Sequence, residues 1–302
     1  MGKIEGLIAA PFAPMSDGEI DLGRVADYAG FLKSGGMSGV FINGTTGESM
    51  SLTSDERMAL VEEWVKYKSD DFKVIVHAGH NSLVDSVRYA RHAVECGADA
   101  LGIMSPFFFK PELAGLIRYI EEVASSAGDL PVYYYHIPSL SGSDFSVYDL
   151  LSGCSGISNL KGVKFTYENL MDFRDCISKE DGRYDMLWGR DEICLAGLSM
   201  GARGFVGSTY NFMAPLYLRI RSLFESGDIE GARLLQDLSI AVIKVMIECG
   251  NGVVGGKAIM KIVGMDLGET RLPLLGLDDV CIDDMKMKLD DLGFFDWVNK
   301  RT

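Results

Sequence analysis

Short runs of apolar residues recur along the first two thirds of the chain, and segments with helical periodicity separate them. The runs are apolar throughout or nearly so, which is typical of parallel strands that are buried on both faces. The expected strands are Gly6–Ala10, Gly39–Asn43, Lys73–Ala78, Ala100–Met104, Val132–His136, Gly162–Phe165, Met186–Gly189 and Gly204–Gly207. The expected helices between them are Asp21–Gly35, Ser54–Lys68, Ser82–Cys96, Pro111–Ser126, Ser146–Leu151, Asn169–Ser178 and Asp191–Met200.

This alternation predicts an α/β fold of the (β/α)8 TIM-barrel class, because right-handed crossovers bring such units round into a ring. An open doubly wound sheet is the alternative, but it would need a Gly-rich phosphate loop where Pro11-Phe12-Ala13-Pro14 stands. After Tyr210 the strand pattern stops. The remaining helices are expected at Pro215–Ser226, Ile229–Cys249, Lys257–Val263 and Asp279–Leu292. We therefore expect a catalytic barrel over residues 1–212 and a helical C-terminal extension, packed on the barrel, over residues 213–302.

Composition narrows the range of partners. The net charge of −14 argues against nucleic acid and anionic membranes, although it says nothing about a small anion in a local pocket. No apolar run approaches the roughly 18 residues of a membrane span, and the first residues lack a secretory signal. The six cysteines are scattered without zinc-ligand spacing, which predicts buried, reduced thiols. A soluble cytoplasmic protein is expected.

Lys164 is the most unusual residue of the expected barrel. It lies between Val163 and Phe165 in a strand, so its side chain must enter the barrel or the helix layer, and both are costly for an ammonium ion. A snorkelling or ion-paired lysine is the ordinary alternative. Active sites of such barrels gather at the C-terminal ends of strands, however, and Lys164 lies at one. Desolvation favours the neutral amine, which attacks carbonyls, so Lys164 is a candidate Schiff-base nucleophile.

Two other strand ends carry matching chemistry. Tyr135 and Tyr133 share one face of their strand by alternation, and Tyr135 lies nearer the strand end, where a phenol could transfer protons. Packing of the sheet is the alternative role for these tyrosines. The turn Gly44-Thr45-Thr46-Gly47 offers amides and hydroxyls that could bind a carboxylate, although such turns also occur without ligands.

Two competing functions remain at this point. His77 and His80, with His92 and Glu48 nearby in sequence, suggest a metal-dependent aldolase or hydrolase, but a third clear ligand is missing. A non-enzymatic binding protein on the same scaffold would be expected to have lost Lys164 or Tyr135, and both are present.

Four ordered motifs together resemble the N-acetylneuraminate lyase and dihydrodipicolinate synthase family of pyruvate-dependent class I aldolases. They are Gly-Thr-Thr-Gly-Glu at 44–48, Tyr-His-Ile-Pro at 135–138, Gly-Val-Lys at 162–164 and Gly-Ser-Thr-Tyr-Asn at 207–211. The resemblance extends from about Gly6 to the C-terminal helices. It implies a covalent lysine imine at Lys164, with no metal and no organic cofactor, and a homotetramer.

Within the family, the resemblance is closer to the lyases. The synthases carry an arginine where Leu140 stands here, and leucine cannot form a charge-assisted bond to a second carboxylate. Asp191 and Glu192 match the lyase pattern of carboxylates that bind a sugar tail. The segment Phe107–Phe109 departs from members that have a tyrosine there, which weakens the synthase interpretation. Val253 and Val254 stand near a loop where relatives often have an aromatic residue, and the sequence does not show their role.

The resemblance implies reversible cleavage of N-acetylneuraminate, a sialic acid, to N-acetylmannosamine and pyruvate. In this scheme Thr45 and Thr46 bind the pyruvate carboxylate, Lys164 forms the imine and Tyr135 transfers protons. The residues expected to hold the sugar chain are Thr166, Gly189, Asp191, Glu192 and Ser208. Dihydrodipicolinate synthase activity, or aldol cleavage or dehydration of another sugar-derived 2-keto acid, is the alternative.

Overall fold

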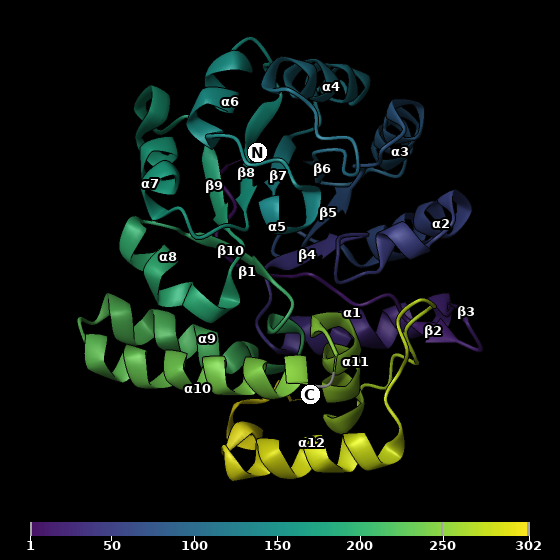
Figure 1. The fold of residues 1–302 in the computed structure, drawn as a ribbon, viewed down its shortest axis with the longest axis vertical. Coiled ribbons are helices and arrows are strands. Elements are labelled where there is room, and N and C mark those ends of the chain that lie inside the picture. The colour runs from purple at the N-terminus through teal and green to yellow at the C-terminus, as the bar shows by residue number, and fades with distance from the viewer. Residues whose placement is uncertain (1, 249, 301–302) are drawn as a thin grey trace.

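A closed barrel of parallel strands forms the centre of the computed structural model, which describes residues 2–248 and 250–300. Within these residues the barrel has eight strands in the order β1-β10-β9-β8-β7-β6-β5-β4 (Figure 1). Their bounds are β1 Gly6–Ala9, β4 Gly39–Ile42, β5 Lys73–His77, β6 Ala100–Met104, β7 Val132–His136, β8 Leu160–Phe165, β9 Asp185–Trp188 and β10 Gly204–Gly207. The (β/α)8 prediction is confirmed, and strand ends differ from expectation by one or two residues.

Helices cover the outside of the barrel. They are α1 Val25–Ser34, α2 Ser54–Trp64, α3 Leu83–Glu95, α4 Leu113–Ser126, α6 Val147–Gly153, α7 Leu170–Ser178, α8 Cys194–Met200 and α9 Tyr210–Glu225. Single 3-10 turns join or extend them at Leu22–Arg24, Ser49–Ser51, Val65–Tyr67, Lys179–Gly182, Asp191–Ile193 and Phe294–Trp297. The cap of α2 is Thr53, which forms a capping box with Glu56.

Two small elements were not expected from the sequence. Strands β2 (Met15–Ser16) and β3 (Glu19–Ile20) form an antiparallel hairpin whose turn residues, Asp17 and Gly18, both have positive φ. Asp-Gly is a common pair in such turns, so the signal was present in a stretch too short for strand periodicity. The short helix α5 (Pro138–Ser141) starts with proline at its first turn.

Strand alternation separates the inside of the barrel from its helix layer. Phe41, Tyr133 and Tyr135 belong to the interior cluster, whereas Tyr134, Val163 and Phe165 pack into the outer core. The prediction that Tyr133 and Tyr135 share one face is therefore confirmed. Lys164, which alternates with Val163 and Phe165, is buried inside the barrel.

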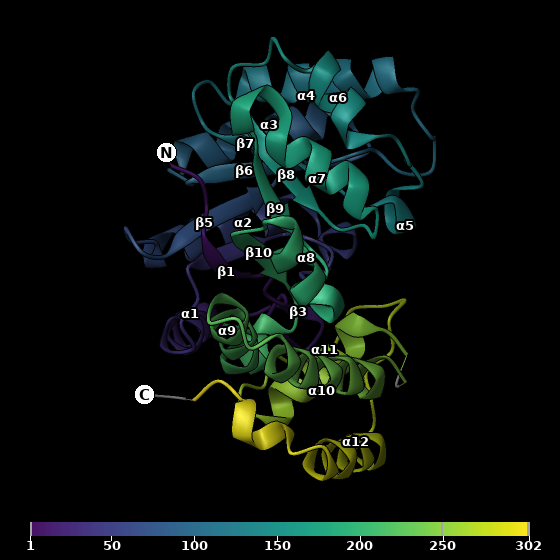
Figure 2. The ribbon, with the colours of Figure 1, turned by 90° about the vertical axis from the view of Figure 1, so that its left-hand side faces the viewer.

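The chain continues past the barrel in the helices α10 (Ile229–Glu248), α11 (Gly252–Ile262) and α12 (Asp279–Asp291). Figures 1 and 2 show α10 beside α9 along one flank of the barrel, and α12 at the far edge of the molecule. Helix α11 begins at Gly252, before the expected Lys257, because the Asn251 side chain caps it. Helix α9 is kinked at Met213, where the predicted boundary between residues 212 and 213 falls; that division stays a prediction.

No single helix in the described residues is long and apolar enough to cross a membrane. Helices α10 and α11 reach the length and apolar composition of a membrane span only when they are taken together, and a bend of 107° separates them. Among the cysteines, Cys154, Cys176 and Cys194 are buried as expected. That expectation is wrong for Cys96, which is half-buried on α3, and for Cys281, which is exposed on α12; Cys249 lies outside the described residues.

Candidate active site

A cleft of about 610 Å³ opens at the C-terminal ends of the strands. Residues from both predicted binding regions line it, with Thr45 and Thr46 on one side and Ser208 on another. Phe107, Leu140 and Val253 are among its apolar lining residues. In a barrel of this class the strand ends are where reacting groups converge, so this cleft is the candidate active site.

Lys164 lies inside the barrel between two aromatic rings. Its Nζ is 3.9 Å from the ring centroid of Tyr135 and 4.3 Å from that of Phe41. Lys164 is 4% exposed, and its amine forms no hydrogen bond or ion pair with another described residue. An ion-paired structural lysine, the alternative considered above, is therefore not what this geometry shows.

Strand register brings Tyr135 to Lys164. The two residues are direct partners in the parallel pairing of β7 with β8, so the barrel itself sets their separation. The phenol oxygen of Tyr135 lies 3.4 Å from Thr45 Oγ1, which connects the tyrosine to the turn after β4. The structure therefore brings three predicted residues, Lys164, Tyr135 and Thr45, into one continuous group.

The turn that carries Thr45 and Thr46 is tight. Glu48 N donates to Thr45 O at 3.0 Å, and Glu48 adopts a left-handed backbone with φ of 52°. Thr45 is exposed and Thr46 half-buried, so both hydroxyls are near the open face of the site. This arrangement suits a small carboxylate that would receive hydrogen bonds from hydroxyls and turn amides.

His77 is buried below the same rings and lines the cleft. Its Nδ1 lies 2.9 Å from the carbonyl oxygen of Asn43. A carbonyl only accepts, so Nδ1 carries the proton. Burial, helped by the nearby Arg57, holds the pKa of His77 well below its usual value, so the ring is neutral.

The other histidines of the metal hypothesis lie elsewhere. His80 Nδ1 accepts from Ser82 N at 3.0 Å, and His92 pairs with Glu62 at 3.0 Å on the surface of the helix layer. In the described part of the chain no group of three or more His, Cys, Asp or Glu residues could hold a metal ion.

Asp191, in the 3-10 turn after β9, is the centre of a buried polar group. Its Oδ2 accepts from both the amide (2.9 Å) and the hydroxyl (2.7 Å) of Thr209, whereas its buried Oδ1 has no hydrogen-bond partner in the described structure. Burial, with the charge of Glu192 second, raises the pKa of Asp191 to about 6. A Cβ on residue 207 would occupy the place of Oδ1, so only Gly207 lets the carboxylate lie so close to β10.

The remaining predicted sugar-binding residues lie around Asp191. Thr166 follows β8, and its buried Oγ1 packs so closely on Gly189 that a side chain there would collide with it. Glu192 is partly exposed, and its Oε1 lies 3.0 Å from Arg190 Nε, so this carboxylate is already ion-paired. Of the two carboxylates, Asp191 therefore offers one buried oxygen, and Glu192 offers a charge that is shared with an arginine.

Comparison with known proteins gives the family of the chain. The model of the dihydrodipicolinate synthetase family matches residues 3–291. The chain belongs to this family. N-acetylneuraminate lyase A of Xenopus laevis is 44% identical over 280 residues, which cover 90% of this chain and 91% of that protein. The N-acetylneuraminate lyase of Homo sapiens is 38% identical over 304 residues, or 98% of this chain and 95% of that protein. A solved N-acetylneuraminate lyase from Proteus mirabilis superposes with a TM-score of 0.93 at 37% identity, covering 97% of this chain and 100% of the other.

The rim of the cleft carries the residues that distinguish this chain within the dihydrodipicolinate synthetase family. Leu140, on α5, is 54% exposed and offers no charge to a second carboxylate. Phe107 packs partly against the interior cluster, whereas Phe108 and Phe109 are 84% and 80% exposed. Val253 lines the same cleft, while Val254 is buried beside a different cavity. Side chains at this rim are thus mainly apolar.

Sequence reasoning missed several residues of this family member that support the site. Phe41 places a ring against Lys164, and Thr209 with Gln236 holds Asp191. Glu48 entered the sequence analysis as part of the 44–48 motif and of the metal hypothesis, yet its side chain forms a buried ion pair with Lys257. The signal for Lys257 was present, because a lysine within the apolar stretch Gly252–Ile262 must reach a partner or the surface.

Proposed function

We propose that this protein is a Schiff-base aldolase that reversibly cleaves N-acetylneuraminate to N-acetylmannosamine and pyruvate. The observation that carries the proposal is the buried amine of Lys164, which contacts two aromatic rings and lies against Tyr135, whose phenol reaches Thr45 at the cleft. An amine in this setting can attack a carbonyl, and the imine then accepts the electron pair of a neighbouring carbon–carbon bond. The lyase names of relatives with about 40% identity support the sialic acid substrate.

The pyruvate half of the substrate would occupy the region of Lys164, Tyr135 and the Thr45–Thr46 turn. With the carboxylate on Thr45 and Thr46, Lys164 attacks C2 and water leaves to give the iminium. Tyr135, assisted by the substrate carboxylate, takes the C4 hydroxyl proton as the C3–C4 bond breaks and N-acetylmannosamine departs. The enamine is then protonated at C3, and hydrolysis of the iminium releases pyruvate and the free lysine.

The sugar half would extend toward Thr166, Gly189, Asp191, Glu192 and Ser208. The free Oδ1 of Asp191 and the buried hydroxyl of Thr166 are hydrogen-bonding atoms that a polyol can satisfy. Leu140 at the rim supports a sugar tail over the second carboxylate of a synthase substrate, because it supplies no cation for that carboxylate.

The imine itself supplies the electron sink, so we propose that no metal and no organic cofactor takes part. The exposed rings of Phe108 and Phe109 support self-association, and the family resemblance suggests a homotetramer. The free buried thiols of Cys154, Cys176 and Cys194 in the described chain support a cytoplasmic location, where thiols stay reduced.

Borohydride reduction in the presence of pyruvate tests the central step. About one pyruvyl adduct per chain is expected, and peptide mapping should place it on Lys164. Lys164→Ala should give no adduct and no cleavage of N-acetylneuraminate, with Lys161→Ala, an exposed lysine on the same strand, as the matched control. Labelling or cleavage by Lys164→Ala would overturn the proposal. Condensation of pyruvate with aspartate semialdehyde, rather than with N-acetylmannosamine, would overturn the substrate assignment.

A further inference from the structure

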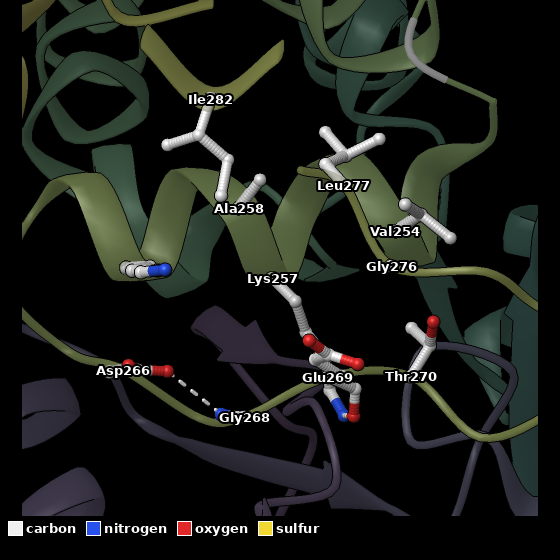
Figure 3. A pocket seen from close by; sticks show the side chains of 11 residues that line it. Val254, Lys257, Ala258, Asp266, Gly268, Glu269, Thr270, Gly276, Leu277 and Ile282 are labelled. Carbon is white, nitrogen blue, oxygen red and sulfur yellow. Dashed lines mark hydrogen bonds between the residues drawn. The ribbon is translucent and has the colours of Figure 1, made fainter. Parts of the chain in front are cut away.

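Outside the reacting groups, a buried ion pair joins the helical extension to the Gly44–Glu48 turn. Lys257 Nζ on α11 lies 2.8 Å from Glu48 Oε1, and the two side chains are 3% and 0% exposed. Lys257 also donates to Glu269 O at 2.8 Å, and Glu48 Oε2 accepts from Arg271 N at 2.9 Å. Figure 3 shows the Lys257 side chain descending from α11 toward the segment that carries Gly268, Glu269 and Thr270.

Stability alone does not account for this pair. Two charges lose their hydration on burial, and an apolar pair of the same size is often as stable as a buried ion pair. Burial indeed lowers the pKa of Lys257, and the charge of Glu48 and its hydrogen bond are the main effects that oppose this shift. A buried ion pair fixes the relative position of the two segments that carry it, because each charge must lie next to its partner.

The strained backbone at Glu48 indicates that the ion pair acts on the turn that carries Thr45 and Thr46. A non-glycine residue with a φ of 52° is strained and persists where surrounding contacts hold it. Glu48 ends the turn that carries Thr45 and Thr46, and its amide closes the turn by donating to Thr45 O. Its side chain therefore fixes the conformation of the turn from the side of the extension.

Arg271 holds the next segment in the same way. Its guanidinium donates to Ser51 O at 3.0 Å and to both oxygens of Glu56, at 2.6 and 2.8 Å. The loop that follows α11 thus holds the chain from Glu48 to the first turn of α2. A cavity of about 170 Å³ lies beside Lys257 between α11 and this loop, so polar partners, more than close packing, fix the ammonium.

We propose that Lys257 and Glu48 are positioning residues for the keto acid, and that the pair holds the Thr45–Thr46 turn at the distance from Lys164 that its carboxylate needs. This inference rests on the proposed function, in which that turn binds the carboxylate of pyruvate. The Asp191 region has a separate support, because Gln236 on α10 donates to Asp191 O and accepts from Leu195 N. Loss of the pair is therefore expected to weaken pyruvate binding without weakening sugar binding.

The double variant Glu48→Gln/Lys257→Met tests this in the condensation direction. It removes both charges while keeping both shapes, so no unpaired charge remains buried and the fold is expected to persist. The KM for pyruvate should rise about tenfold or more, while the KM for N-acetylmannosamine stays within about twofold. Lys257→Arg should keep much of the pyruvate affinity, because it keeps the charge and the cavity offers room. Lys261→Met, one turn further along α11 in an exposed pair with Asp279, is the matched control and should change neither constant.

Steady-state kinetics, tests of folding and pyruvate labelling together separate the possible outcomes. An unchanged pyruvate KM in a folded double variant, as judged by its melting temperature and circular dichroism, would overturn the positioning role. An equal rise of both KM values would also overturn it, because it would indicate a general structural defect. If pyruvate labelling survives in Lys164→Ala, the proposed function fails instead. Labelling that is lost in Lys164→Ala and reaches half-saturation at higher pyruvate in the double variant supports both.

Discussion

The proposed pyruvate and sugar halves of the site are built by different means. On the pyruvate side, Lys164 and Tyr135 lie on neighbouring strands as direct register partners, with Phe41 from β4 completing an apolar base. On the sugar side, Asp191 and Glu192 lie in a 3-10 turn after β9, and hydrogen bonds from Thr209 and Gln236 hold Asp191. Strand pairing sets the first geometry, and side-chain bonds set the second.

This difference separates chemistry from specificity. A register partner cannot be moved without shifting a strand, so the positions of Lys164 and Tyr135 are determined by the barrel itself. The sugar side depends on individual polar contacts, each of which a single substitution can remove. We therefore expect substitutions of Lys164 or Tyr135 to affect turnover, and substitutions on the sugar side to affect affinity for the sugar.

The largest effect is expected on the pyruvate side, from Tyr135→Phe. The ring and its contact with Lys164 remain, but the phenol that moves protons is lost, so kcat should fall by roughly 10²–10⁴ in both directions. Borohydride trapping at saturating pyruvate, measured together with steady-state cleavage, separates slow chemistry from lost binding. A fall of less than about threefold in kcat would remove Tyr135 from the catalytic role.

Asp191→Asn should have the next largest effect, and on the other side. One oxygen of Asp191 is already used by Thr209, so the substitution weakens the bonds that Oδ1 would make to substrate hydroxyls. Loss of a charge-assisted hydrogen bond corresponds to about a 10- to 100-fold higher KM for N-acetylmannosamine. The pyruvate concentration that half-saturates trapping should not change, and a parallel change in it would contradict the separation of the two halves.

The same difference explains which features could be predicted from the sequence. The apolar strand pattern and Lys164 were visible because parallel strands are continuously apolar, so a lysine in one of them stands out. Tyr135 followed from alternation together with its place near the strand end. The placement of Asp191 and Glu192 came from resemblance, because no local periodicity predicts how a turn after a strand is held.

Contacts between distant segments were beyond the sequence. Strands β5 to β10 lie between Glu48 and Lys257 in the chain, and although Lys257 stands out in its apolar stretch, nothing local shows that Glu48 is its partner. The same holds for Gln236, which meets Asp191 only after α10 has folded back along α9. The start of α11 was placed too late because glycines at its beginning hide the helical pattern that the Asn251 cap permits.

The affinity for the sugar should also depend on pH, and this effect should be smaller than the two preceding ones. Burial raises the pKa of Asp191 to about 6, above the value of an unfolded aspartate, so the folded protein is protonated at this position as the pH falls below 6. If only the carboxylate accepts the sugar hydroxyls, the KM for N-acetylmannosamine should rise about tenfold from pH 7 to pH 5. Asp191→Asn should lose this dependence, and a profile that persists in that variant would assign it to another group.

The ionisation of Asp191 should also change the stability of the protein. The contribution of Asp191 to stability should fall as the pH rises, whereas sugar affinity should increase. A carboxyl whose pKa is raised by folding favours the native state when protonated, so its contribution is complete below about pH 4 and is lost as the pH rises through about 6. Denaturant unfolding at several pH values should therefore show a larger stabilisation by Asp191→Asn at pH 7.5 than at pH 4.5. Equal effects at both values would show that the buried carboxylate carries no such cost.

Glu192→Gln should give the smallest change and the sharpest check of the sugar side. Glu192 is partly exposed and already paired with Arg190, so removing its charge should raise the KM for N-acetylmannosamine only about two- to fivefold at pH 7. Its charge also contributes to the raised pKa of Asp191, after burial. The pH midpoint of sugar affinity should therefore move below that of the unsubstituted protein while pyruvate trapping keeps its own profile. A midpoint that does not move would mean that burial alone sets the ionisation of Asp191, and that Glu192 acts on the sugar without acting through its neighbour.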